Sequence, residues 1–428
     1  MKRTSSAILF AALSGTLAAP PAFPQDPAFP QNPAPQSRDP FELESVHSLT
    51  WRGDAGLVLL GGDTPDDSIE MLADLELGLD FESFTDLGRR WGFVLTGHAE
   101  RDLPGAAHGG RVGSCPAAVG DCARVGTVAA PQTPIASDSG LFSDGAFGGD
   151  RSRAAITEAY LFTDTGWGEV RLGYGAGAAR LDPVGGPATA RLVRADGGHL
   201  RASSVTAVRT EAPHSGQDPK FVFRSVALGQ ETTVGTVRAA VSFTPEVSQC
   251  GVDYCPRGTG PGGQVGAINR DVAELALTYQ VRRGEHEWAA SLSASQAGRV
   301  EGGPGFEPVS GVDAGLSWRW QDWRAGGRWR RSNNAVSGSG DYEAWASSIG
   351  WESGDWLTTL EFAASSDDFV HSDSEIWQIA SSRLVGDHGL VAFGLQAAET
   401  SFPESSGPGR VQREVDAFTA FLELGWRY

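Results

Sequence analysis

The sequence is poor in methionine, cysteine and basic residues, and it lacks any long apolar run. Only 2 of its 428 residues are Met and 4 are Cys, while 34 Lys and Arg stand against 53 Asp and Glu, for a formal net charge of -19. The chain has no central stretch of about 18 apolar residues, which excludes helical membrane spans. Nucleic-acid binding needs a basic surface and is excluded as well.

Conventional catalytic motifs are also missing. The 8 His residues are scattered without metal-ligand spacing, and the chain contains no Walker A motif, no G-x-S-x-G and no H-E-x-x-H. Gly173, Gly175 and Gly177 follow an expected strand, but no helix or downstream acid completes a dinucleotide site. We therefore expect no enzyme, no resident metal and no cofactor. His98 beside Glu100 is the one suggestive pair, and it keeps a barrel enzyme as an alternative.

Glycine and tryptophan are abundant instead, and the clearest pattern lies at the end of the chain. Gly reaches 56 and Trp 13, which is typical of many short strands joined by Gly-rich turns. From Arg413 to Tyr428 every second residue is apolar, the exception being Phe421 on the polar face with Glu423. An alternation that ends on two aromatics favours a strand between lipid and a wet lumen.

The same period of two recurs along the chain. We predict about sixteen strands, at residues 55–62, 69–83, 91–101, 154–163, 168–173, 221–228, 234–243, 272–282, 287–295, 313–321, 324–331, 342–351, 355–364, 375–384, 390–399 and 413–428. Short turns alternate with longer loops, and an even strand count lets the first and last strands pair. Residues 45–428 are therefore expected to form an all-β, antiparallel transmembrane barrel with long extracellular loops.

The N-terminal residues indicate export. Lys2 and Arg3 precede an apolar run, which is the layout of a signal peptide over residues 1–19. A Pro-rich repeat over 20–44 is expected to form an extended periplasmic linker. The four cysteines are expected to form two local disulfides in loops, Cys115 with Cys122 and Cys250 with Cys255. A zinc site fits these spacings poorly.

Two sets of charged residues on polar strand faces are candidates for lining a pore. The acidic set lies on one face of the second strand and comprises Glu70, Asp74, Glu76, Asp80 and Glu82. The basic set lies opposite tryptophans on one hairpin and on two other strands, and comprises Arg171, Arg238, Arg319, Arg324, Arg328 and Arg330. A solvated face of a soluble sheet is the alternative reading for any single residue. Together the two sets predict a transverse field across a channel.

Several stretches resemble the general diffusion porins of Gram-negative outer membranes, alphaproteobacterial ones in particular. They are Glu158–Tyr160, Gly166–Gly173, Ala239–Pro245 and the aromatic C-terminal strand. The resemblance implies a sixteen-stranded barrel, a homotrimer, and passive diffusion of ions and small hydrophilic solutes across the outer membrane. It also implies that residues 175–218 fold inward as a constriction loop, with its charges at Arg180, Asp182, Arg191, Arg194 and Asp196.

The resemblance further implies that the C-terminal strand, with Trp426 and Tyr428, is the signal read by the barrel insertion machinery. A solute-specific channel and a surface adhesin remain alternatives to general diffusion. A loop with Asp138, Asp144 and Asp150 offers oxygen ligands for Ca²⁺, although a solvated acidic loop is the favoured interpretation.

Overall fold

The computed structural model describes most of the chain from residue 47 onward. The described ranges are 47–63, 69–85, 88–103, 138, 153–197, 208–211, 214–231, 233–247, 268–301, 306–335, 338, 340–368, 372–406 and 409–428. The predicted signal peptide, the linker and all four cysteines lie outside them, so these stay predictions. No helix in these ranges is long and apolar enough to cross a membrane.

The described chain is almost entirely β-strand. The first nine strands are β1 His47–Asp63, β2 Glu70–Phe84, β3 Arg90–Leu103, β4 Arg153–Thr165, β5 Gly168–Tyr174, β6 Lys220–Ser225, β7 Leu228–Gln230, β8 Gly235–Glu246 and β9 Ile268–Arg283. The others are β10 His286–Gln296, β11 Arg299–Glu301, β12 Ser310–Trp320, β13 Trp323–Ser332, β14 Tyr342–Ser353, β15 Trp356–Asp367, β16 Ser372–Val385, β17 Gly389–Ser406 and β18 Gly409–Arg427. One short helix, α1 Ala178–Leu181, follows β5.

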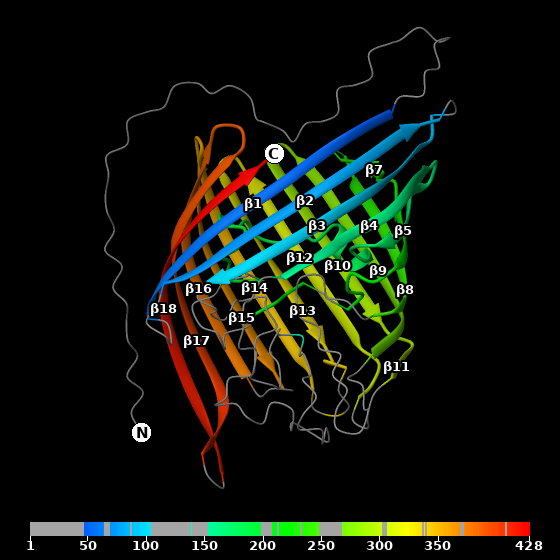
Figure 1. The fold of residues 1–428 in the computed structure, drawn as a ribbon. Helices are drawn as coiled ribbons and strands as arrows, with labels where there is room; N and C mark the ends of the chain where they lie inside the picture. Colours follow the sequence, from blue (N-terminus) through cyan, green and yellow to red (C-terminus); the bar gives the residue numbers. More distant parts are fainter. Residues whose placement is uncertain are drawn as a thin grey trace. The chain divides into compact units, whose positions relative to one another are not determined.

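These strands form one closed antiparallel barrel (Figure 1). Strands β6 and β7 both pair with β8, and strands β10 and β11 both pair with β9. Each of these two sets is therefore one interrupted strand of the barrel, and the barrel is sixteen-stranded. The first and last strands close it in a register that runs from Asp54 opposite Arg427 to Asp63 opposite Phe418. Closure leaves no free sheet edge. The predicted fold class is confirmed.

Several strands are longer than predicted, and two differences from the predicted ranges have a clear physical cause. The first strand begins at His47, eight residues earlier than expected, because Leu49 and Trp51 face outward while Arg52 faces the polar interior, where a charge is tolerated. The strand expected at 221–228 is broken after Ser225, where the amide of Val226 bonds to the carbonyl of Trp167 at 3.0 Å. Both departures come from tertiary contacts that the local pattern does not contain.

The outer face of the barrel is apolar and carries aromatic residues at two levels. Leu77, Leu161, Leu172 and Leu292 are all more than half exposed on it. In the β13–β14 register Trp323 lies opposite Trp351 and Trp329 opposite Trp345, six residues away, which corresponds to about 20 Å along a strand. An apolar band between two aromatic girdles is the surface that a bilayer requires.

The inner face is polar over part of its circumference and packs against protein over the rest. Residues 175–197, 208–211 and 214–218, called the inner segment below, enter the barrel after β5. Ala190, Leu192 and Val193 of this segment form a buried apolar cluster with inward side chains of β1, β2 and β16–β18, among them Phe421. Phe421 interrupts the alternation of the last strand because it packs on the inner segment rather than facing water.

Candidate functional site

Glutamates of the barrel hold the backbone of the inner segment. Glu423 on β18 accepts hydrogen bonds from the amides of Arg191 and Leu192, each at 2.9 Å, and from that of Val193 at 3.3 Å. Glu361 on β15 accepts from the amide of Ala195 at 3.2 Å. Each of these carboxyl groups accepts from backbone amides of the segment, so the two glutamates fix the segment in place.

A third wall glutamate, Glu274 on β9, fixes the beginning of the inner segment. It accepts from the amide of Ala179 in α1 at 3.3 Å and from Ser242 at 2.8 Å. The alternating pattern of the last strand predicts that Glu423 faces inward, but the sequence pattern does not single out Glu274 or Glu361. Each is an isolated acid on an inner face of small polar residues, and that isolation is the one sequence signal that could have identified them.

Glycines allow the inner segment to lie directly on the wall. A Cβ at Gly186 would lie 2.0 Å from the Ser348 hydroxyl, and a Cβ at Gly315 would lie 1.9 Å from the carbonyl oxygen of Val184. Any larger residue at either position would separate the backbone of the segment from β12–β14. The segment therefore lies directly against the inner faces of β12–β14.

The predicted acidic set lies on the inner face of β2. Asp74 forms an ion pair with Arg191 of the inner segment, Asp80 lies 3.5 Å from Arg52, and Glu82 lies 3.0 Å from Arg90. Glu76 shares this face by strand parity. The side chain of Glu70 lies outside the described residues.

Neighbouring strands add charges that the sequence analysis did not single out. Arg52 donates to Glu158 at 2.7 Å and to Thr96 at 2.8 Å. Arg90 reaches Asp164 and Glu169, each at 2.8 Å. These residues follow inner-face parity as single charges rather than as a ladder, which is why the pattern did not reveal them.

Most members of the predicted basic set face inward, but they differ in accessibility. Arg330 is fully buried and donates to the carbonyl of Glu211 at 2.8 Å, while Arg328 is 10% exposed and bonds to the Glu211 carboxylate at 3.3 Å. Arg319 and Arg324 both pair with Glu352. Two members of the set therefore hold the inner segment and are largely covered by protein.

The remaining basic residues, Arg171 and Arg238, lie on β5 and β8. Arg171 pairs with Glu169 at 2.5 Å, and its guanidinium lies 4.9 Å from the centre of the Tyr160 ring. Arg238 lies 4.0 Å from Asp182 of the inner segment. Asp182 also accepts from Arg224 at 2.8 Å, so it joins the segment to β6 and β8.

Charges of the predicted constriction loop mostly pair with neighbours. Arg180 lies 3.6 Å from Glu211, and Asp196 accepts from the amide of Thr210 at 2.8 Å. Burial alone would raise the pKa of the Glu211 carboxyl, but the guanidinium groups of Arg180, Arg328 and Arg194 outweigh it and hold this pKa below its ordinary value. Glu211 is therefore ionised at neutral pH.

Asp138, one of the three acids considered for Ca²⁺, lies inside the barrel. Its carboxylate accepts from Arg330 at 2.5 Å and lies 2.9 Å from His214 Nε2, and Ser332 also donates to it. Burial would raise the pKa of this carboxyl, but the opposite effect of Arg330 and His214 is larger, so the pKa lies well below its ordinary value. Asp144 and Asp150 lie outside the described residues.

One cluster has ligand types that could hold a metal ion. Asp74, His98 and Glu100 face the interior from β2 and β3, with one potential ligand atom of each within 4.8 Å of the others. His98 Nε2 lies 3.5 Å from Glu100 and bonds directly to Asp74. Because Asp74 also pairs with Arg191, an ion here would have to displace an existing cation.

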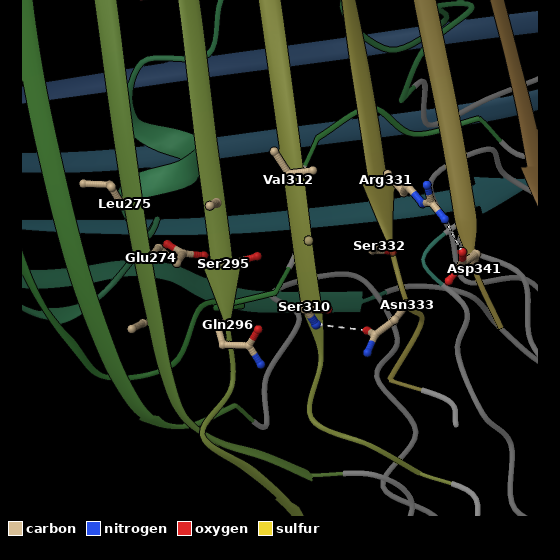
Figure 2. Close-up of a pocket in the computed structure, with 13 residues that line it drawn as sticks. Glu274, Leu275, Ser295, Gln296, Ser310, Val312, Arg331, Ser332, Asn333 and Asp341 are labelled. Atoms are coloured by element: carbon tan, nitrogen blue, oxygen red, sulfur yellow. Dashed lines mark hydrogen bonds and ion pairs between the residues drawn. The ribbon is translucent and has the colours of Figure 1, made fainter. Parts of the chain in front are cut away.

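A groove on the other side of the barrel wall does not belong to this interior. Figure 2 shows a groove of about 570 Å³ over β9, β10, β12 and β13, with Arg331 paired to Asp341 at 2.6 Å and the Ser310 amide bonded to Asn333 at 2.9 Å. Leu275 is 49% exposed and the Arg331 side chain 56% exposed at this groove. Both face outward, so the groove is part of the outer surface.

Comparisons with known proteins support the architecture but not a sequence family. No family model matches the chain, and no curated protein matches it. The outer membrane channel DcaP of Acinetobacter baumannii aligns over 89% of this chain and 97% of its own, with 11% identity and a TM-score of 0.51. An anion-selective porin of Comamonas acidovorans aligns over 90% and 99%, with 13% identity and a TM-score of 0.47.

A trimer form of OmpT from Vibrio cholerae aligns over 89% of this chain and 99% of its own, with 11% identity and a TM-score of 0.48. At such identities the likeness concerns fold alone, and at that level the predicted resemblance to outer-membrane porins is confirmed. An antiparallel barrel with an even number of strands, an apolar outer belt and a charged interior is the architecture of multi-pass outer-membrane proteins of Gram-negative bacteria.

Proposed function

We propose that the chain is a porin, which forms a water-filled channel for passive diffusion of ions and small hydrophilic solutes across the outer membrane. The observation that carries the proposal is the inner segment, which is fixed by Glu274, Glu361 and Glu423 and covers one side of the interior. The other side keeps many charged groups that are partly exposed, Arg52 at 42% and Asp164 at 39% among them. Such a narrowed, charged passage selects solutes by width and charge.

The inward charges of β1–β8 are acidic on one side and richer in arginine on the other. Partly exposed acids, namely Glu76, Asp80, Glu82, Glu158 and Asp164, face inward on β2–β4, whereas Arg52 and Arg90 are the described arginines facing inward on β1–β4. Arg171, Arg224 and Arg238 follow on β5, β6 and β8. We infer a transverse field across the passage and a preference for cations.

The test is single-channel recording in planar lipid bilayers. The wild type should give stable conductance with a reversal potential that favours cations under a KCl gradient. The triple variant Glu76→Gln, Asp80→Asn, Glu82→Gln should shift the reversal potential towards zero because three inward carboxylates are removed.

Glu343→Gln with Glu375→Gln, on the exposed outer face, is the matched control and should leave the reversal potential unchanged. An unchanged reversal potential in the triple variant would overturn the role of the β2 acids. Correct insertion without any conductance would overturn the channel and favour an outer-membrane enzyme or an adhesin.

We also propose a homotrimer that reaches the membrane through the barrel insertion machinery, with Trp426 and Tyr428 as part of the signal. The proposal rests on the sequence resemblance and on the exposure of these side chains, which is 58% for Trp426 and 76% for Tyr428. Gel mobility before and after heating tests it, because a folded trimer migrates differently from a boiled chain. A single unheated species of monomer mobility would contradict the trimer.

A further inference from the structure

A second hollow lies between the inner segment and the barrel wall. Its volume is about 280 Å³, and it is bounded by Gly185 and Gly186 of the segment and by inward side chains of β13–β15. Its base is close-packed, because a Cβ at Gly185 would lie 2.8 Å from Arg328 Cδ. The hollow is thus a cavity with a tightly packed wall that lies between the inner segment and β13–β15.

Two arginines of this cavity have hydrogen-bonding capacity left. Arg194 comes from the inner segment and Arg328 from β13, and both line the cavity. The Nε atoms of both are buried, and among the described residues neither has a hydrogen-bond partner. The side chain of Arg328 is nine-tenths buried, so bulk water does not compensate this donor. A guanidinium binds a carboxylate best through its planar fork of donors.

The three carboxylates of the cavity differ in how many hydrogen bonds they already accept from the protein. Asp196 accepts two hydrogen bonds from Thr210, and Glu361 accepts from the Ala195 amide and, at 3.0 Å, from Thr359. Glu211 has only long contacts to guanidinium groups, at 3.3 Å and 3.6 Å, and its side chain is 45% exposed. Glu211 is therefore the carboxylate that remains available to a cation.

We propose that this cavity binds a small zwitterionic solute, with its carboxylate on Arg194 and Arg328 and its ammonium group on Glu211. The inference rests on the proposed channel function and deepens it by naming a class of solute. A simple anion would satisfy the arginines but would lie close to three carboxylates. A simple cation would satisfy Glu211 but would lie close to the guanidinium groups of Arg194 and Arg328. A solute with both charges a few bonds apart meets both requirements.

The volume also limits the size of the solute. Pockets for drug-sized ligands usually span about 300–1,000 Å³, and this cavity lies just below that range. We therefore expect an α-amino acid with a small side chain rather than a peptide or a sugar.

The experiment is calorimetric titration of the folded, full-length protein in detergent with L-alanine, lactate and isopropylamine. The last two probes each lack one of the two charges. We expect saturable binding of alanine and at least about tenfold weaker binding of each single-charge probe, because each leaves one charged partner in the cavity uncompensated. Arg194→Gln and Arg328→Lys should each weaken alanine binding by about tenfold, the second because lysine lacks the planar fork.

Arg383→Gln, an exposed arginine near the end of β16 that lies outside the cavity, is the matched control and should bind alanine like the wild type. Equal binding of alanine and lactate, or undiminished binding by folded Arg194→Gln and Arg328→Lys, overturns the inference. The conductance of the same preparation is measured separately, by single-channel recording in planar lipid bilayers. Normal conductance without alanine binding overturns the site alone, and alanine binding without conductance overturns the channel alone.

Discussion

At the residue scale, the interior is organised by carboxylates and guanidinium groups that are shared between the wall and the inner segment. Asp74 on β2 pairs with Arg191, and Arg328 on β13 pairs with Glu211. Glu211 is the clearest case of a titrating group outside the strands, since three arginines lower its pKa.

Glu211 predicts a dependence of stability on pH. A carboxyl with a lowered pKa in the folded state contributes stability above its unfolded value of 4.5, and this stability is lost as the pH falls through the folded pKa. Glu211→Gln should therefore lower the free energy of unfolding at pH 7 by about 1 kcal/mol or less, since the group is 45% exposed. Denaturant unfolding in detergent at pH 7, 5 and 3 measures this difference. It should persist from pH 7 to 5 and shrink below 4.5. A difference that grows on acidification would contradict the prediction.

At the element scale, the inner segment keeps its course because its own amides bond to glutamates of the wall. Its apolar residues add packing against β1, β2 and β16–β18. The segment therefore depends on side chains that are more than 200 residues away along the chain, as Glu423 is from Arg191.

Replacement of Glu423 should loosen the inner segment while leaving the barrel closed. In Glu423→Gln one oxygen becomes an NH2 group that faces backbone donors, which costs about 1–3 kcal/mol for the buried groups left unsatisfied. We expect faster cleavage by trypsin after Arg191 or Arg194 in the folded protein. Glu375→Gln on the outer face serves as the control. Identical digestion of wild type and Glu423→Gln would show that apolar packing alone holds the segment.

At the scale of the whole molecule, the seam between β1 and β18 closes the barrel. The last residue contributes directly, since the Tyr428 amide bonds to the carbonyl of Gly53 at 2.8 Å and the Gly53 amide to the carbonyl of Tyr428 at 3.1 Å. Closure of a barrel is cooperative because an open seam exposes two strand edges to lipid.

Removal of Tyr428 should impair assembly before it alters conductance. The truncated chain loses both bonds to Gly53 as well as an aromatic ring that is 76% exposed at the barrel end. We expect a smaller heat-modifiable fraction in the outer membrane, measured by gel mobility, while the channels that do form conduct normally. Tyr428→Phe keeps the backbone and the ring and should assemble like the wild type. Full insertion of the truncated chain would refute this prediction.

Much of the fold follows from local pattern. The period of two over residues 69–83 and 413–428 identified strands with unlike faces, and short turns such as 321–322 separated them into hairpins. The inward position of Asp74, Asp80 and Glu82 follows from the same parity, because successive side chains in a strand point to opposite faces.

The sequence alone thus determined that the chain forms a sixteen-stranded barrel and which side chains face inward, since the alternation of side chains along a strand is a local property. Only the tertiary structure decided which inward charges remain accessible. Arg330 and Arg171 both face inward, yet Arg330 is fully covered by Glu211 and Asp138 while the Arg171 side chain stays partly exposed. That difference depends on where the inner segment lies, and contacts between residues distant in sequence fix its course.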